Sequence, residues 1–282
     1  MQALFGGGLV TLRDATGRRV RVRKGERVAP GFVVELAVEE AALDERAVPD
    51  HALALDVVLE RPELVVVDKP AGVASAPLIA GERGTVANAL LARYPEMQAI
   101  GFSPREPGLC HRLDTGTSGL LIAARSTASF DRVVTHLRSG AMDKRYLLVC
   151  EESAGSELEE HGTIKLPLTA HPTDKRRVVV FEGDEDSAAE GRPAETSYHV
   201  LERRGTRALV EACAHRAFRH QIRAHFAALR APLVGDPLYG GPDEGLGRYA
   251  LHASHLSFAG DELVAQFSVD SPLPEAVARL VR

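Results

Sequence analysis

The sequence predicts an α+β fold in which helices flank a mostly antiparallel sheet. Short β-prone runs outnumber the helical patterns, their connections vary in length, and strands and helices do not alternate regularly. A length of 282 residues, with 45% hydrophobic and 26% charged residues, fits one large globular domain with a small appendage. The sequence contains no internal repeat or low-complexity tract that would predict another architecture.

Residues 1–45 are predicted to form the appendage, which is small and β-rich. It contains three β-prone runs separated by glycine and proline, namely Leu9–Leu12, Val20–Val22 and Phe32–Leu36. An acidic, alanine-rich segment follows, so we expect a linker over residues 46–56. Residues 57–282 are then the main domain.

Local signals mark the elements of the main domain. Leu64–Val67 is a continuous apolar run, typical of a buried strand that ends in a turn. Thr85 is expected to cap a helix that Pro95 ends, and Ser126 a second helix that Gly140 ends. Further short strands are expected at Tyr146–Cys150, Ile164–Leu168, Val178–Phe181, Tyr198–Glu202 and Ala208–Ala212, the last two as a hairpin. A last helix contains Ile222, Phe226 and Leu229 at helical spacing, and Pro232 closes it.

Net charge does not identify a partner for this protein. Acidic residues outnumber basic ones by 39 to 34, which disfavours a generic nucleic-acid coat. Only five of the basic residues are lysine, and arginine offers a planar fork for phosphate and stacks on bases. A GC-rich genome would produce the same excess of arginine, so the composition leaves the class of partner open.

The cysteines and apolar runs favour a cytoplasmic protein. Cys110, Cys150 and Cys213 lie far apart, which disfavours a disulfide framework or a cysteine-based zinc site and suits a reducing compartment. No run approaches the roughly 18 apolar residues that a membrane helix needs. The N-terminal residues also lack the basic region and long apolar core of a secretory signal.

The densest group of reactive side chains lies in the segment His111–Gly119, just before the apolar run Leu120–Ile122. One acidic, two basic and three hydroxyl residues occur within it. The pattern fits a catalytic loop. It also fits an ordinary polar turn in which Asp114 and Thr117 satisfy backbone N–H groups.

A second group, His215–His225, joins a strand to the start of the last helix. Arg223 and His220 lie off the apolar face of that helix, so we expect them to face a cleft. A helix start surrounded by arginine attracts anions. A solvated basic helix end explains the same pattern equally well.

Two other kinds of site fit the spacing poorly. The histidines His111, His215, His220 and His225 could converge on a metal, but no metal-binding spacing is present and the last two are misaligned on a helix. A serine hydrolase is disfavoured because the sequence has no Gly-x-Ser-x-Gly elbow.

Four segments resemble, in order and spacing, the motifs of the RluA-type pseudouridine synthases. His111–Leu121, which reads HRLDTGTSGLL, is similar to the family signature over eleven positions. The other similar segments are Val65–Pro77, Lys144–Tyr146 and His220–His225, the last followed by Gly235–Gly240. The resemblance covers about residues 55–270. It implies the pseudouridine synthase fold, a mixed and mostly antiparallel sheet with flanking helices and a central cleft.

Two features depart from the family pattern. Arg216–Arg219 stands where the family usually has Thr-Gly-Arg-x before His-Gln-Ile-Arg. The family's arginine is therefore missing, and Arg216 or Arg219 is the candidate to replace its phosphate or base contact. Many members also carry an N-terminal S4-type RNA-binding domain. Residues 1–40 resemble at most the trailing β part of that domain.

The resemblance implies a reaction that detaches uracil from C1′ of its ribose, rotates it and rejoins it through C5. This chemistry needs no cofactor. The resemblance assigns Asp114 as the catalytic nucleophile and Arg223 as the cation that keeps it ionised. It implies that Tyr146 stacks on the uracil and that its phenol assists proton transfer at C5. Addition of the aspartate to the base, capture of C1′ and a glycal intermediate all stay open.

The implied partner is RNA, either rRNA or tRNA, bound by a monomer that does not contact a membrane. Arg112 is the expected residue to fill the space of the flipped-out base. The other expected substrate-binding residues are His111 and Ile222, and, as phosphate contacts, Lys69, Arg216 and Arg219. The alternatives are a catalytically idle RNA-binding or ribosome-assembly protein on the same scaffold and, more remotely, a hydrolase that uses Asp114 with His111.

Overall fold

The computed structural model describes residues 10–20, 27, 30–36, 44–155, 157–181, 191–214 and 217–282. The chain separates into two compact units, Met1–Glu45 and Arg46–Arg282. The first unit holds an antiparallel sheet in the order β2-β1-β3, built from β1 (Val10–Arg13), β2 (Arg19–Val20) and β3 (Val33–Leu36). Leu9, Arg21 and Val22, which belong to the expected runs, lie outside the described residues.

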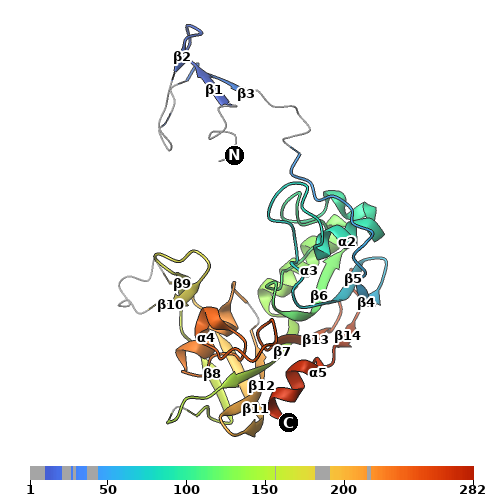
Figure 1. Cartoon of the computed structure of the whole chain (residues 1–282). Helices are drawn as coiled ribbons and strands as arrows, with labels where there is room; N and C mark the ends of the chain where they lie inside the picture. The colour runs from blue at the N-terminus through green and yellow to red at the C-terminus, as the bar shows by residue number, and fades with distance from the viewer. Residues whose placement is uncertain are drawn as a thin grey trace. The chain divides into compact units, whose positions relative to one another are not determined.

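The second unit is built on a nine-stranded mixed sheet in the order β4-β5-β6-β13-β7-β12-β11-β8, with β14 paired to β13 (Figure 1). Its strands are β4 (Asp56–Glu60), β5 (Leu64–Lys69), β6 (Ser118–Ala124), β7 (Met142–Glu151), β8 (His161–Ile164), β11 (Thr196–Arg204), β12 (Arg207–Cys213), β13 (Leu251–Phe258) and β14 (Phe267–Asp270). β6 and β13 run parallel, and the other neighbouring strands are antiparallel. The α+β fold with a mostly antiparallel sheet is therefore confirmed.

The helices of this unit are α2 (Val86–Arg93), α3 (Thr127–Ser139), α4 (Gln221–Ala228) and α5 (Glu275–Ala278), with the 3-10 helices η2 (Pro95–Ala99), η4 (Pro237–Tyr239) and η5 (Arg279–Val281). The three predicted helices are α2, α3 and α4, the last of which ends just before Leu229, and α5 was not predicted. The side chains of Thr85 and Ser126 accept the N–H of the third residue beyond them, which confirms both N-caps. Gly140 ends α3 in the left-handed conformation, with φ 79°.

Strand β5 begins with four consecutive apolar residues because both faces of the sheet are covered there. On β5, Val65 and Val67 pack into the core on the face that carries α2 and α4, whereas Leu64 and Val66 pack into the core on the α3 face. All four side chains are fully buried. This double burial explains why the strand appears in the sequence as a continuous hydrophobic run instead of an alternating one.

Two expectations for the strands need correction. Ile164–Leu168 is not one strand, because β8 ends at Ile164 and β9 (Leu168–Ala170) begins a separate two-stranded sheet with β10 (Val178–Val180). Pro167 lies between them and cannot donate a hydrogen bond to a sheet. Asp56, expected in the linker, already belongs to β4. The predicted hairpin is confirmed as β11 and β12, which pair up to Arg204 and Arg207 with a register shift between Val200 and Glu202.

The parallel contact between β6 and β13 lies at the middle of the sheet and is very close. Gly119 pairs with Ala253, and a Cβ on Gly119 would lie 2.2 Å from the carbonyl oxygen of Ala253. Its φ of 108° is also one that side chains rarely adopt. The loop that precedes β6 is thereby brought to the centre of the face that carries α2 and α4. In the described residues, no helix is long and apolar enough to cross a bilayer.

Candidate active site

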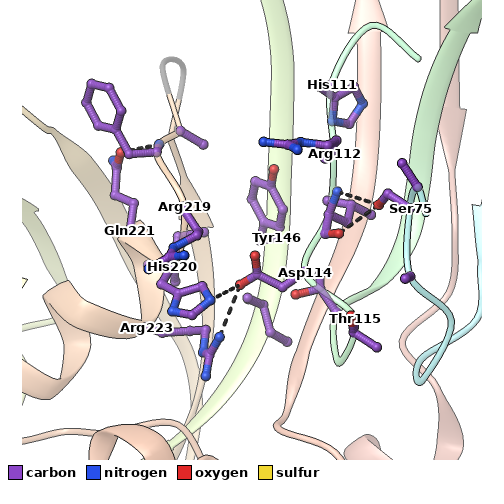
Figure 2. Close-up of a pocket in the computed structure, with 18 of the residues that line it drawn as sticks. Ser75, His111, Arg112, Asp114, Thr115, Tyr146, Arg219, His220, Gln221 and Arg223 are labelled. Atoms are coloured by element: carbon purple, nitrogen blue, oxygen red, sulfur yellow. Dashed lines mark hydrogen bonds and ion pairs between the residues drawn. The ribbon is translucent and has the colours of Figure 1, made fainter. Parts of the chain in front are cut away.

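The loop that precedes β6 carries Asp114, and its backbone is held on both sides of that residue (Figure 2). Ser75 Oγ donates to the carbonyl of Leu113 at 2.7 Å and accepts the Leu113 N–H at 3.0 Å. The carbonyl of Thr115 accepts the N–H of Gly72 at 2.8 Å. Because both neighbours are fixed, the Asp114 carboxylate has a defined position, 24% exposed, at the cavity.

Lys69 supports this loop from within the protein and is not one of the residues that line the cavity. Its side chain is fully buried, and Nζ donates to the carbonyls of Pro70, Val73 and Thr115 at 3.0, 2.7 and 3.2 Å. Burial lowers the pKa of Lys69 to about 8. The expected phosphate contact is therefore wrong, because the ammonium group is enclosed by carbonyl groups that tie the turn after β5 to the Asp114 loop.

We expect Lys69→Met to lower the free energy of unfolding by about 3 kcal/mol, because three part-buried carbonyls lose the hydrogen bond from the ammonium group. Chemical denaturation would measure this loss. The exposed Lys165, paired with Glu195 at 3.5 Å, supplies the matched control Lys165→Met, for which a change below about 0.5 kcal/mol is expected. The salt dependence of RNA binding should stay the same in folded Lys69→Met protein. A weaker salt dependence of RNA binding in the variant would show that Lys69 does contact a phosphate.

Arg223, in the first turn of α4, is ion-paired with two carboxylates at once. Its Nη1 lies 3.2 Å from Asp114 Oδ2 (Figure 2), and its Nε and Nη2 lie 2.6 and 2.9 Å from the two oxygens of Asp236. Burial works to lower the pKa of Arg223, but the Asp236 hydrogen bonds and neighbouring groups raise it above its usual value. The sequence-predicted pair of Asp114 and Arg223 is thus brought together.

Asp236 and Tyr249 complete this cluster and were not assigned a role from the sequence. Asp236 is 1% exposed and aligns Arg223 through two parallel hydrogen bonds. Arg223 Cζ lies 4.1 Å from the centre of the Tyr249 ring. That ring packs on Gly116, where a Cβ would lie 2.6 Å from it. Gly116 is the one local sign in the sequence that a large side chain packs against this loop.

Tyr146, Ile222 and Leu251 form the apolar part of the cavity wall. Tyr146 lies on β7 with 6% exposure, and Figure 2 shows its ring beside Asp114. Burial raises the pKa of Tyr146, and the charge of Asp114 adds to the shift, so the phenol stays protonated at neutral pH. Ile222, on α4, is 5% exposed. The positions of Tyr146 and Ile222 are compatible with the expected contacts to a base.

His111 and Arg112 lie on the other side of the cavity from α4 (Figure 2). His111 Nε2 accepts the N–H of Ile122 at 3.2 Å, and burial lowers the pKa of the imidazole to about 3. This ring is therefore neutral and anchored to β6. Arg112 has a side chain that is 68% exposed and is ion-paired with Glu106 at 2.8 Å. Its guanidinium is accessible to a nucleotide.

The structure describes one of the two arginines expected before α4, Arg219. Arg219 is exposed at the cavity, and its Nη2 donates to the carbonyl of Lys175 at 2.8 Å, in the loop between β9 and β10. Arg216 lies outside the described residues, as does His215. The phosphate contacts expected for Arg216 and Arg219 stay predictions.

Three of the four histidines that suggested a metal site, His111, His220 and His225, have other partners. His225 is buried, with Nδ1 2.9 Å from Thr196 Oγ1 and Nε2 2.9 Å from the carbonyl oxygen of Leu166. His220 lies next to Asp114 and Tyr239. Among the residues that the structure describes, no group of three or more His, Cys, Asp or Glu side chains is placed to hold a metal ion.

These residues surround a cavity of about 800 Å³, in the range of pockets that hold small organic ligands. Its polar wall includes Arg112, Asp114, Arg219, His220 and Arg223. Two carboxylates, Asp114 and Glu106, thus line the cavity together with four arginines, of which Arg176 is the fourth. The arrangement suits an anionic ligand whose reacting atom meets the positioned carboxylate of Asp114.

Comparison with known proteins agrees with this geometry. Residues 63–228 match the family model described as RNA pseudouridylate synthase. The chain is 32% identical over 277 residues to the ribosomal large subunit pseudouridine synthase D of Xanthomonas campestris, covering 93% of this chain and 77% of that protein. It is 32% identical over 263 residues to the uncharacterized RNA pseudouridine synthase YlyB of Bacillus subtilis, covering 92% and 82%.

A solved structure shares the fold. The human RNA pseudouridylate synthase domain containing 1 protein superposes with a TM-score of 0.60 at 24% identity, covering 79% of this chain and 86% of that one. The family match ends at residue 228, before Asp236 and Tyr249. The folding of the chain brings Asp236 and Tyr249 from beyond the matched range into contact with Arg223.

Proposed function

The chain belongs to the RNA pseudouridylate synthase family, and on that premise we propose that it converts uridine to pseudouridine in large-subunit ribosomal RNA, with Asp114 as the nucleophile. The family membership makes the protein an isomerase that acts on RNA. The choice of ribosomal RNA over tRNA is supported by relatives named for the large ribosomal subunit, among them those of Xanthomonas campestris and Xylella fastidiosa.

The observation that carries the proposed mechanism is the ion pair between Asp114 and Arg223, 3.2 Å apart at the cavity. The guanidinium donates a charge-assisted hydrogen bond to the carboxylate and so fixes the direction in which it faces the cavity. Asp236 holds the guanidinium in place, so the carboxylate is oriented before the substrate arrives.

The other cavity residues support a flipped-out uridine. Removing a base from its stack costs a few kcal/mol, less in a loop than in a helix. The flat ring of Tyr146 offers a stacking surface next to Asp114, and Arg112 at the exposed rim is free to enter the space that the base leaves. Arg219 adds positive charge near the same cavity. This local charge reconciles RNA binding with a net charge of −5.

A map of pseudouridine in a deletion strain tests the proposed function. Carbodiimide treatment followed by primer extension should show the loss of at least one pseudouridine in large-subunit rRNA. Purified protein added to RNA from the deletion strain should restore it. Loss confined to tRNA would overturn the choice of substrate, and an unchanged map would overturn the function. If Asp114→Asn protein restored growth as well as the wild type, the idle RNA-binding protein would be the better explanation.

A further inference from the structure

His220, immediately before α4, has an unusual backbone conformation. Its φ of 58° and ψ of 13° lie in the left-handed region, which residues other than glycine seldom occupy. Such conformations persist where the surroundings hold them, and they occur often at functional sites. Figure 2 shows the result, an imidazole that points across the cavity at Asp114 from the side opposite Arg112.

The hydroxyl of Tyr239 determines which ring nitrogen of His220 carries the proton. Tyr239 Oη donates to the carbonyl of Val178 at 3.1 Å and accepts the Val178 N–H at 3.1 Å. Its single proton is therefore used, so Oη accepts from His220 Nδ1, which lies 3.1 Å away. In the neutral ring, Nδ1 is then protonated and Nε2 has a free lone pair.

That lone pair faces Asp114. Nε2 lies 3.7 Å from Asp114 Oδ2, which is too long for a hydrogen bond between them. Burial lowers the pKa of His220 and outweighs the opposing charge of Asp114, so the ring is neutral at neutral pH. His220 Nε2 and Asp114 Oδ2 are both hydrogen-bond acceptors and face each other across a short gap. Neither can donate to the other, so a substrate group placed between them would have to supply the proton.

The charged groups around the ring oppose one another. Asp114 and Asp236 favour the imidazolium, whereas Arg223 and Arg219 disfavour it, and burial is the largest effect on the pKa of His220. Arg223 contacts both carboxylates directly, so its positive charge offsets part of their effect on the ring.

We propose that Nε2 of His220 is the base that removes the proton from C5 of the rejoined uracil and returns it to N1, a role that rests on the proposed function. Once C5 is bonded to C1′, it still carries its hydrogen and N1 is doubly bonded to C6. His220 takes the proton, and the C5–H electron pair forms the C5–C6 double bond. The former N1–C6 pair moves onto N1, which accepts the proton from the imidazolium. Histidine is regenerated, and no other reactant is consumed.

Other titratable groups at the cavity are less suited to this step. Tyr146 stays protonated, because burial raises its pKa. The acceptor nitrogen of His111 is occupied by the N–H of Ile122. Glu106 is neutralised by its ion pair with Arg112 at 2.8 Å. Asp114 is engaged by Arg223 and, in the proposed mechanism, by the substrate itself.

The test compares rates on a large-subunit rRNA transcript with hydrogen or deuterium at C5 of uridine. His220→Asn keeps a residue that tolerates the left-handed region but cannot accept a proton at neutral pH. Its rate should fall about a hundredfold, and the deuterated transcript should react measurably more slowly than the normal one. His199→Gln, an exposed histidine that stacks on His161, is the matched control and should behave as the wild type does.

A second variant separates a base from a structural side chain. His220→Gly removes the imidazole at a φ that suits glycine, and added imidazole should restore part of the rate. Folded His220→Asn protein with a rate within a few-fold of wild type would overturn the proposal. So would a slow variant that shows neither an isotope effect nor rescue of the glycine variant. A wild-type protein that forms no pseudouridine would instead overturn the proposed function, and the role of His220 with it.

Discussion

Asp114→Asn is expected to abolish pseudouridine formation while the protein stays folded. The amide has nearly the shape of the carboxylate, but it is neither a nucleophile nor a base at neutral pH. Loss of an essential nucleophile reduces kcat by about 10⁴-fold or more. A single-turnover assay on rRNA from the deletion strain measures this directly, and Asp114→Ala should give the same result.

The fold should tolerate the Asp114 substitution because the main partner of Arg223 persists. Asp236 keeps both of its hydrogen bonds to the guanidinium, and Asp114 itself is 24% exposed. We expect the free energy of unfolding to change by no more than about 1 kcal/mol, read by thermal or chemical denaturation. Asp131→Asn, on the exposed side of α3, is the control and should retain full activity. Substantial turnover by folded Asp114→Asn protein would show that Asp114 is not the nucleophile.

The parts of the fold that were predicted depend on neighbours in sequence. The caps at Thr85 and Ser126 and the stop at Gly140 use backbone groups three or four residues away, so residue type alone reveals them. The pairing of β6 with β13 depends on residues more than a hundred positions apart. No local pattern specifies such a pairing, and the parallel contact became visible only in the structure.

The candidate site likewise contains residues that a local motif predicts and residues that only contacts between distant parts of the chain reveal. Asp114 and Arg223 were recognised because each lies in a short motif of its own, although they meet across 109 positions. Lys69 was misassigned because lysine is rarely buried, and nothing near it in sequence reveals the carbonyl of Thr115 that helps to enclose it. Asp236 received no role, because its function is to orient a side chain that only the fold brings near.

Arg223→Lys is expected to damage both stability and catalysis, although the positive charge is kept. The guanidinium makes three contacts in fixed directions, two to Asp236 and one to Asp114, and it stacks on Tyr249. An ammonium group is a point charge and cannot reproduce this fork. If the ammonium group approaches Asp236, then Asp114 loses its partner, and if it approaches Asp114, then Asp236 does.

The two losses are measured separately. If Asp236, which is 1% exposed, is left unpaired, the free energy of unfolding should fall by about 3 kcal/mol in chemical denaturation. If Asp114 loses its positioned cation, kcat should fall by about 10²- to 10³-fold in a single-turnover assay. Arg132→Lys is the matched control, because Arg132 is ion-paired with Asp261 at 3.0 Å on the exposed surface of α3. It should leave both quantities unchanged.

A double variant then shows which loss belongs to which carboxylate. Adding Asp236→Asn to Arg223→Lys removes the buried charge, so the stability should recover in part, whereas the rate should not, because Asp114 still lacks an aligned guanidinium. Recovery of both would mean that Asp236 acts on the reaction by itself. Recovery of neither would mean that Tyr249 and the packing of the guanidinium, instead of its hydrogen bonds, hold the site together.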